Sequence, residues 1–137
     1  MAPKVARLGH VSLETPNLDQ SLSFFRDAVG LEIVERGDET VFLRAVDEHD
    51  HHSLSLTESD TARVDHIGWQ TAEPEDVTGF AEKFERYGFD LTWVEEGTEP
   101  GQGAAIRFEI PSGHRFELYG TMEKPEPPVE RRSKLKN

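Results

Sequence analysis

The sequence contains no cysteine, which excludes disulfides, thiolate zinc sites and cysteine nucleophiles together. It also lacks any apolar run near the roughly 18 residues that a membrane helix requires, so we expect no membrane partner. The first residues, Met1-Ala-Pro-Lys, have no apolar core of the kind found in signal peptides, and we expect a cytoplasmic protein. Chemistry must therefore come from His, Asp, Glu, Ser, Tyr or Arg side chains.

Positive charge is scarce. The 137 residues carry 15 Lys+Arg against 27 Asp+Glu, a formal net charge of −12. Because phosphate binding needs clustered cations, this balance argues against a nucleic-acid partner. The acid excess suits a surface kept soluble at high salt, so a halophilic protein and an ordinary acidic protein are both open interpretations.

The chain contains an internal repeat. Leu-Gly-His-Val-Ser-Leu around His10 resembles Val-Asp-His-Ile-Gly-Trp around His66, and a proline and a helical pattern follow each segment. Gly30 and Gly88 stand where the two helices are expected to end in the left-handed conformation. Two modules that share one core are the simplest account of this length and repeat.

Each module is expected to fold as strand, helix and three strands. Helical spacing is seen in Leu18, Leu22, Phe25 and Val29, and again in Val77, Phe80, Phe84 and Tyr87. The later strands are expected at 32–36, 40–46 and 53–57, then at 90–95, 104–109 and 115–119. Neither module has enough core alone, so the two pack together, and we expect a homo-oligomer, a dimer or higher.

The domain boundaries follow from the repeat and from composition. One domain is expected over residues 1–121, with module one at about 6–60 and module two at about 64–121. Residues 122–137 contain three of the eight prolines and few apolar side chains, which predicts a polar tail, either an exposed linker or a loosely docked arm. Trp69 and Trp93 are expected in the core.

The candidate metal ligands are His10, His66 and Glu117. The repeat places the two histidines at equivalent positions on two first strands, and a pseudo-two-fold axis brings such positions together. Alternation along 115–119 directs Glu117 to the same cleft. Two imidazoles and one carboxylate leave open positions on a metal, as non-haem Fe(II) enzymes require. The alternative is that these are hydrogen-bonded strand residues without a metal.

Three further features concern the cleft. His51 and His52 open the last strand of module one, where an imidazole can move protons near neutral pH. The alternative for residues 47–52 is a solvated polar turn, which is the interpretation preferred for His49. Residues 97–103, rich in glycine, predict a flexible loop that covers a cleft, and His114 is expected to be exposed.

These segments resemble the vicinal-oxygen-chelate superfamily over about residues 6–121, an α+β fold of two paired βαβββ modules that form a half-barrel around a central metal cleft. The likeness is greatest to the N-terminal domain of extradiol dioxygenases of the catechol 2,3-dioxygenase type. It is carried by Leu8-Gly-His-Val-Ser-Leu-Glu-Thr-Pro, Phe24-Phe-Arg-Asp-Ala-Val-Gly-Leu, His51-His-Ser-Leu-Ser-Leu, Val64-Asp-His-Ile-Gly-Trp and Pro111-Ser-Gly-His-Arg-Phe-Glu-Leu-Tyr.

The resemblance implies an Fe(II)-dependent enzyme, with Mn(II) or another divalent metal as the alternative, that cleaves a small aromatic diol with dioxygen. His10, His66 and Glu117 fall on the family's ligand positions, and His52 falls on its acid/base position. Arg107 stands where the family has tyrosine, and implies an anion-holding donor. Thr98 stands where the family has a second histidine.

Two other functions remain open at this point. The same His, His and Glu set is found in single-domain relatives such as fosfomycin-resistance transferases and glyoxalase-like isomerases, which use the metal without dioxygen. A non-catalytic structural lobe of a two-domain dioxygenase is the other alternative.

Overall fold

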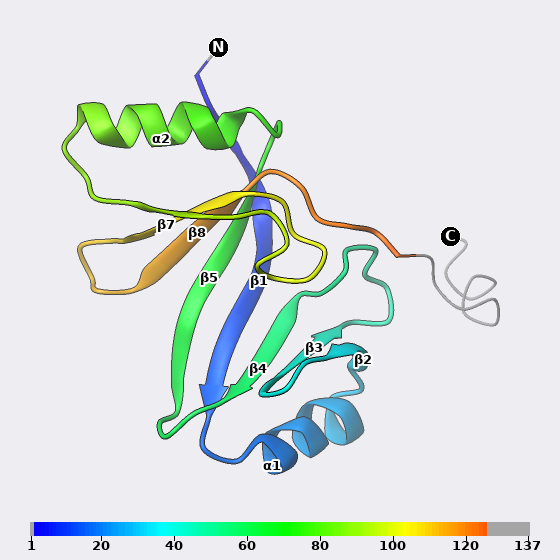
Figure 1. The fold of residues 1–137 in the computed structure, drawn as a ribbon. Helices are drawn as coiled ribbons and strands as arrows, with labels where there is room; N and C mark the ends of the chain where they lie inside the picture. The colour runs from blue at the N-terminus through cyan, green and yellow to red at the C-terminus, as the bar shows by residue number, and fades with distance from the viewer. Residues whose placement is uncertain (1, 126–137) are drawn as a thin grey trace.

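The computed structural model describes residues 2–125 (Figure 1). Within this range eight strands form one sheet in the order β2-β3-β4-β1-β5-β8-β7-β6. The strands are β1 Val5–Thr15, β2 Glu32–Arg36, β3 Thr40–Arg44, β4 Leu54–Glu58, β5 Arg63–Thr71, β6 Thr92–Val94, β7 Ala105–Glu109 and β8 Arg115–Tyr119. The helices are α1 Leu18–Ser23, η1 Phe24–Ala28 and α2 Asp76–Arg86.

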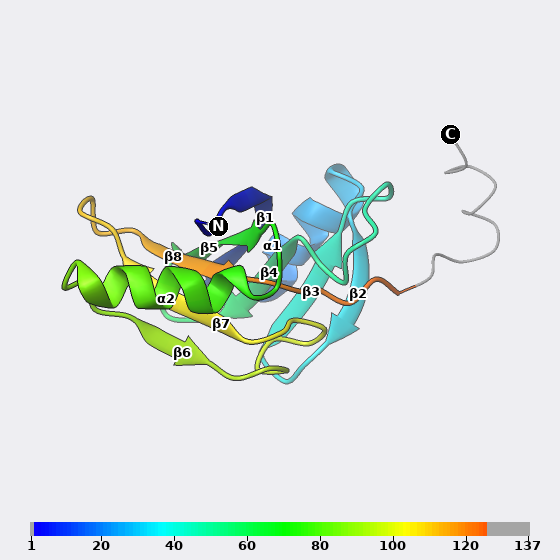
Figure 2. The ribbon, with the colours of Figure 1, turned by 90° about the horizontal axis from the view of Figure 1, so that it is seen from above.

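The sheet is built from two equivalent halves. In each half the first strand pairs with the last in parallel, β1 with β4 and β5 with β8. The halves join where β1 and β5 pair in antiparallel orientation. Seen from above, the sheet curves into an open half-barrel (Figure 2). The predicted α+β fold of two βαβββ modules is confirmed.

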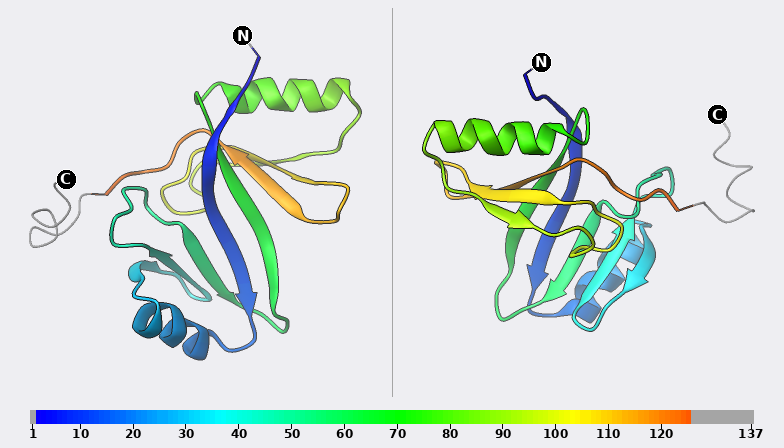
Figure 3. Two further views of the ribbon diagram at one scale, coloured as in Figure 1. Left: turned by 180° about the vertical axis from the view of Figure 1, so that it is seen from behind. Right: turned by 45° about the horizontal axis from the view of Figure 1, so that its top comes forward.

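Alternation along the strands separates an apolar face from a polar one. Under α1, Leu22 packs with Leu43 of β3 and Leu56 of β4, and α2 covers an equivalent cluster in the second half: Val77, Ala81, Ile106 and Leu118. The intervening strand residues face the other side, which no helix of residues 2–125 covers. Figure 3 shows α1 and α2 at opposite ends of the sheet.

The first helix departs from the predicted pattern. Its second part is a π-helix, in which the Val29 amide donates to the Phe24 carbonyl at 3.0 Å. The wider turn rotates the following side chains away from the core, so Val29 is 53% exposed although its spacing predicted burial. Gly30 and Gly88 follow their helices with φ of 90° and 78°, as predicted.

One further prediction needs correction. Trp69 packs against the cluster under α2, but Trp93 is 49% exposed because it lies on the short strand β6 at the sheet edge. The start of the predicted tail is docked, since Met122 is buried and the Glu123 amide donates to the Gly101 carbonyl. The rest of that tail, 126–137, lies outside the described residues. No helix of residues 2–125 has the length and apolar character needed to cross a membrane.

Candidate metal centre

The site forms where the two modules meet. On the β1–β5 pair, His10 lies opposite Gly68 and Ser12 lies opposite His66, so the two histidines share one face diagonally. Gly68 also lies opposite Glu117 in the β5–β8 pair. A Cβ added to Gly68 would lie 2.3 Å from His10 Cε1. The absence of a side chain at residue 68 therefore gives the His10 ring its place beside Glu117.

The three predicted ligand residues converge. His10 Nε2 lies 3.2 Å from His66 Nε2 and 3.2 Å from Glu117 Oε1, and His66 Nε2 lies 3.7 Å from that oxygen. All three side chains are buried. The structure thus brings His10, His66 and Glu117 into one cluster on the polar face of the sheet.

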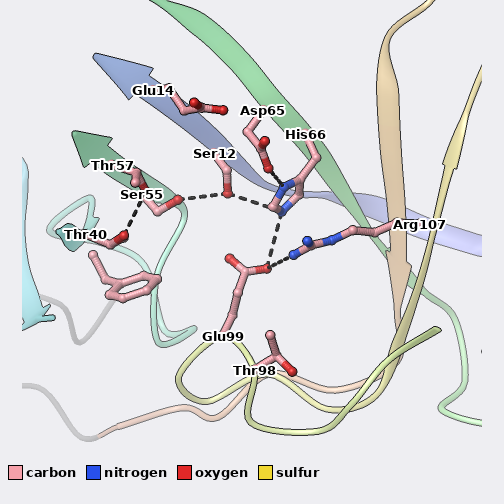
Figure 4. A pocket seen from close by; sticks show the side chains of 11 residues that line it. Ser12, Glu14, Thr40, Ser55, Thr57, Asp65, His66, Thr98, Glu99 and Arg107 are labelled. Carbon is pink, nitrogen blue, oxygen red and sulfur yellow. Dashed lines mark hydrogen bonds and ion pairs between the residues drawn. The ribbon is translucent and has the colours of Figure 1, made fainter. Parts of the chain in front are cut away.

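Glu99 joins this cluster and was not predicted. It lies on the loop between β6 and β7, and its Oε2 is 3.3 Å from His66 Nε2 and 3.4 Å from His10 Nε2 (Figure 4). One ligand atom from each of His10, His66, Glu99 and Glu117 lies within 4.8 Å of the others. The loop at 97–103 was predicted to cover a cleft, but its sequence does not indicate that Glu99 points inward.

The donor set fits a divalent metal. Four ligands about 2.1 Å from one ion at tetrahedral angles lie about 3.4 Å apart. Five of the distances between the ligand atoms of this cluster are 3.2 to 3.7 Å. These atoms are His10 Nε2, His66 Nε2, Glu99 Oε2 and Glu117 Oε1. His66 Nδ1 also lies 2.8 Å from Asp65 Oδ2, the carboxylate contact that orients many metal-bound histidines. Imidazole and carboxylate donors together suit Mn(II), Fe(II) or Zn(II).

Arg107 pairs with both carboxylates. Its Nε donates to Glu117 Oε2 at 2.6 Å and its Nη2 donates to Glu99 Oε2 at 3.4 Å. Burial raises the pKa of Glu117, but the hydrogen bond with His10 and the charges of His66 and His10 together outweigh it and leave that pKa below its usual value. The pKa of Glu99 is likewise lowered, because hydrogen bonds with His10, His52 and His66 outweigh its burial. Both acids are therefore anionic at neutral pH.

The two central imidazoles differ in their protonation. Burial lowers the pKa of His10. The hydrogen bonds with Glu117 and Glu99 and the charges of these carboxylates together outweigh burial and raise the pKa to about 9 in the metal-free chain. Burial dominates at His52 and lowers its pKa despite the nearby Glu99. At neutral pH His52 is thus a neutral base beside a cluster that holds a proton on His10.

His52 is supported by a chain of polar contacts. Its Nδ1 lies 2.9 Å from His51 Nδ1, and His51 Nε2 lies 3.0 Å from Glu35 Oε1. Asp50, His51 and His52 are all buried, so the solvated-turn interpretation of 47–52 is wrong for these three. His49 and His114 are exposed, as predicted. Asp50, which precedes His51, is buried and accepts a hydrogen bond from Arg7 Nη2 at 2.6 Å.

A pocket of about 270 Å³ opens beside the cluster. It is smaller than the roughly 300–1,000 Å³ of drug-sized sites, which suits a small ligand. Ser12 accepts a hydrogen bond from Ser55 at 2.8 Å and lies 3.2 Å from His66 Nε2 (Figure 4). The lining residues are Ser12, Glu14, Thr40, Phe42, Ser55, Thr57, Asp65, His66, Thr98, Glu99 and Arg107.

Comparison with known proteins agrees with this geometry. The model of the catechol 2,3-dioxygenase-like N-terminal domain matches residues 64–123. A manganese-dependent 2,3-dihydroxybiphenyl 1,2-dioxygenase of Geobacillus genomosp. 3 is 52% identical over 100% of this chain and 44% of its own length. A metapyrocatechase of Geobacillus stearothermophilus is 34% identical over 97% of this chain and 40% of its own.

Solved structures give the same result. Homoprotocatechuate 2,3-dioxygenase from Brevibacterium fuscum superposes with a TM-score of 0.88 and 27% identity, over 98% of this chain and 42% of that one. The homoprotocatechuate 2,3-dioxygenase of Arthrobacter globiformis has a TM-score of 0.87 and 26% identity, over 96% of this chain and 41% of that one.

Fold and sequence together define a vicinal-oxygen-chelate domain. Within that superfamily the chain belongs to the N-terminal-type domains of extradiol ring-cleavage dioxygenases. It spans less than half the length of the curated relatives that it matches.

Proposed function

We propose that this chain is a metal-binding domain of an extradiol dioxygenase that cleaves a catechol-type aromatic diol with dioxygen. The observation that carries the proposal is the convergence of the His10, His66 and Glu117 ligand atoms at 3.2 to 3.7 Å. The names of the relatives support the substrate class, since they include dioxygenases of biphenyl diols. One related enzyme was solved with 3,4-dihydroxyphenylacetate.

His10, His66 and Glu117 would hold Fe(II) or Mn(II). The nitrogen and oxygen donors suit both ions, and the Geobacillus relative is named as manganese-dependent. When bound, such a metal supplies Lewis acidity toward the diol oxygens and a site for dioxygen.

His52 would act as the acid/base residue. Its lowered pKa keeps the ring neutral, and its Nε2 lies 3.5 Å from Glu99 Oε1, beside the proposed ligand cluster. A neutral imidazole at this place can accept a proton from a diol hydroxyl and return it. Arg107 would hold the Glu117 carboxylate in place, and its positive charge beside the pocket favours an oxyanion or a carboxylate-bearing substrate.

Anaerobic loading with Fe(II) or Mn(II), followed by a spectrophotometric ring-cleavage assay with catechol, tests the proposal. We expect about one metal per chain, lost in His66→Ala, because an imidazole ligand is removed. His52→Ala should keep the metal and lower turnover by about 10²–10⁴-fold. Full turnover by His52→Ala would refute its acid/base role, and a metal content unchanged in His66→Ala would refute the ligand set.

A non-catalytic, metal-stabilised lobe is the second candidate. Glu99 and Arg107 favour it, because both already contact the groups that a substrate would need. In that case metal would raise the unfolding temperature while catechol is not consumed by the metal-loaded chain. The two readouts separate the candidates.

We also propose that the chain forms a homo-oligomer. The sheet ends in the strands β2 and β6, and edge strands are surfaces on which further chains pair. Sedimentation velocity at several protein concentrations tests this, and a monomer at all of them would refute it.

A further inference from the structure

We propose that Glu99 is a fourth protein ligand of this metal centre, which closes it against a diol until the carboxylate moves away. This rests on the proposed metal site and adds a ligand beyond the predicted three. A centre with two imidazoles and one carboxylate leaves positions for substrate and dioxygen, and a second carboxylate occupies one of them.

The position of Glu99 Oε2 carries the inference. Its distances to His66 Nε2 and His10 Nε2, 3.3 and 3.4 Å, fall within the 3.2 to 3.7 Å that Glu117 Oε1 keeps from the same two nitrogens. The two carboxylates are thus equivalent with respect to the imidazoles. The other oxygen of Glu99, Oε1, lies 3.5 Å from His52 Nε2. Glu99 therefore stands both at the metal position and at the nitrogen assigned to substrate deprotonation.

The loop that carries Glu99 is built to hold it there. The Gln102 amide donates to the Glu99 carbonyl at 3.1 Å, and the Gly97 amide donates to the Gln102 carbonyl at 2.9 Å. The buried Gln102 side chain donates to Glu117 Oε1 at 2.9 Å, so the loop is tied to a ligand residue. Gly97 and Gly101 have φ of 83° and 80°, which lets the chain turn on both sides of Glu99.

Glu99 is also well buried for an acid, at 8% exposure, and Arg107 Nη2 at 3.4 Å links it to the other carboxylate. Isolated buried carboxylates are costly, so the cluster needs positive charge to balance the two acids. A divalent ion between His10, His66, Glu99 and Glu117 supplies it. The rival explanation is that Glu99 only balances protonated imidazoles in the metal-free chain.

Metal affinity and diol access distinguish these explanations. Mn(II) binding is measured by calorimetry at one pH for the wild type, Glu99→Ala, Glu99→Gln and the matched control Glu96→Ala. Glu96 lies on the same loop and is exposed. Anaerobic titration with 4-nitrocatechol then follows the colour change of the diol when it binds at the metal. Thermal unfolding of each metal-free variant checks that it is folded.

We expect Glu99→Ala to weaken Mn(II) binding at least about tenfold, with a smaller loss in Glu99→Gln and none in Glu96→Ala. The Mn(II)-loaded wild type should bind 4-nitrocatechol at least about tenfold more weakly than loaded Glu99→Ala, because the diol must displace the carboxylate.

Unchanged Mn(II) affinity in folded Glu99→Ala would overturn the inference and leave the three-ligand site intact. If Glu99→Ala does not fold, the wild type still decides: two carboxylates in the Mn(II) coordination shell by X-ray absorption support the inference, and one overturns it. A wild type that binds no Mn(II), Fe(II) or Zn(II) would overturn the metal site itself, and the inference with it.

Discussion

The two modules share one frame and differ in what they place in the cleft. Ser55 in β4 lies opposite Ser12 on β1 as Glu117 in β8 lies opposite Gly68 on β5. Their neighbours differ in the same way, since Phe42 pairs with Ser55 and Arg107 pairs with Glu117. Module two therefore supplies both carboxylates and the guanidinium, while module one supplies most of the buried imidazoles: His10, His51 and His52.

This difference separates geometry from chemistry. The repeat fixes where side chains point, and single residue types at equivalent positions decide what they do. Ser55 donates to Ser12 at 2.8 Å, a neutral contact that needs no counter-charge. Glu117 at the matching position needs Arg107, Gln102 and His10 around it. A charged site therefore forms on one side of the pseudo-symmetric sheet.

The largest expected effect is from Glu117→Ala. Removing this carboxylate removes a proposed ligand and takes from Arg107 and His10 one of the two carboxylates they contact, so we expect more than about 100-fold weaker Mn(II) binding and about 3–5 kcal/mol lower stability. Calorimetry and urea unfolding measure the two. Ser55→Ala is the matched change in module one and should alter neither by more than about 1 kcal/mol. Equal effects of the two substitutions would contradict the functional asymmetry.

The next effect concerns Gly68, where the modules meet. In Gly68→Ala the new methyl group would overlap His10 Cε1 at 2.3 Å, so the ring must move. We expect about 1–3 kcal/mol lower stability and about 10–100-fold weaker Mn(II) binding. Gly37→Ala serves as the control, because its Cβ would meet the Thr40 carbonyl at an ordinary 3.5 Å. Wild-type affinity in Gly68→Ala would show that His10 does not need this space.

The metal-free chain should lose stability as pH rises. The pKa of His10 is raised from 6.5 to about 9, so its proton stabilises the fold fully below pH 6.5 and is lost as pH rises through 9. The expected loss is on the order of 2–3 kcal/mol by urea unfolding at pH 6 and pH 10. The pKa of His52 is lowered, so its neutral ring stabilises the fold above pH 6.5, and this stabilisation is lost as pH falls below that value. His10→Gln should remove the loss, and a variant that keeps it would contradict the assignment.

The smallest effect is expected from Ser12→Ala. Its hydroxyl lies 3.2 Å from His66 Nε2 and accepts from Ser55, but it is not among the proposed ligands. We expect a stability change of about 0.5–1.5 kcal/mol and less than tenfold weaker Mn(II) binding. A loss as large as that of Glu117→Ala would place Ser12 among the ligands.

Most of the fold was predictable from the sequence because the repeat and the strand periods agree. His10 and His66 could be paired from their flanking residues alone, and alternation placed Glu117 on their face. The exposure of Val29 was not predictable, because one wide helical turn is enough to rotate it out of the core. Glu99 was missed because its direction depends on the loop conformation between Gly97 and Gly101. The hydrogen bond of Gln102 to Glu117 is equally non-local.

The junction of β1 and β5 has a consequence for the order of folding. The ligand atoms of the cluster come from β1, β5, the loop after β6, and β8, the last strand in the described chain. The parallel pairing of β5 with β8 must close a long stretch of chain, and contacts of this kind form late. A chain emerging from the ribosome would therefore acquire the complete site only after β8 has docked. Metal uptake would then report that this sheet is complete.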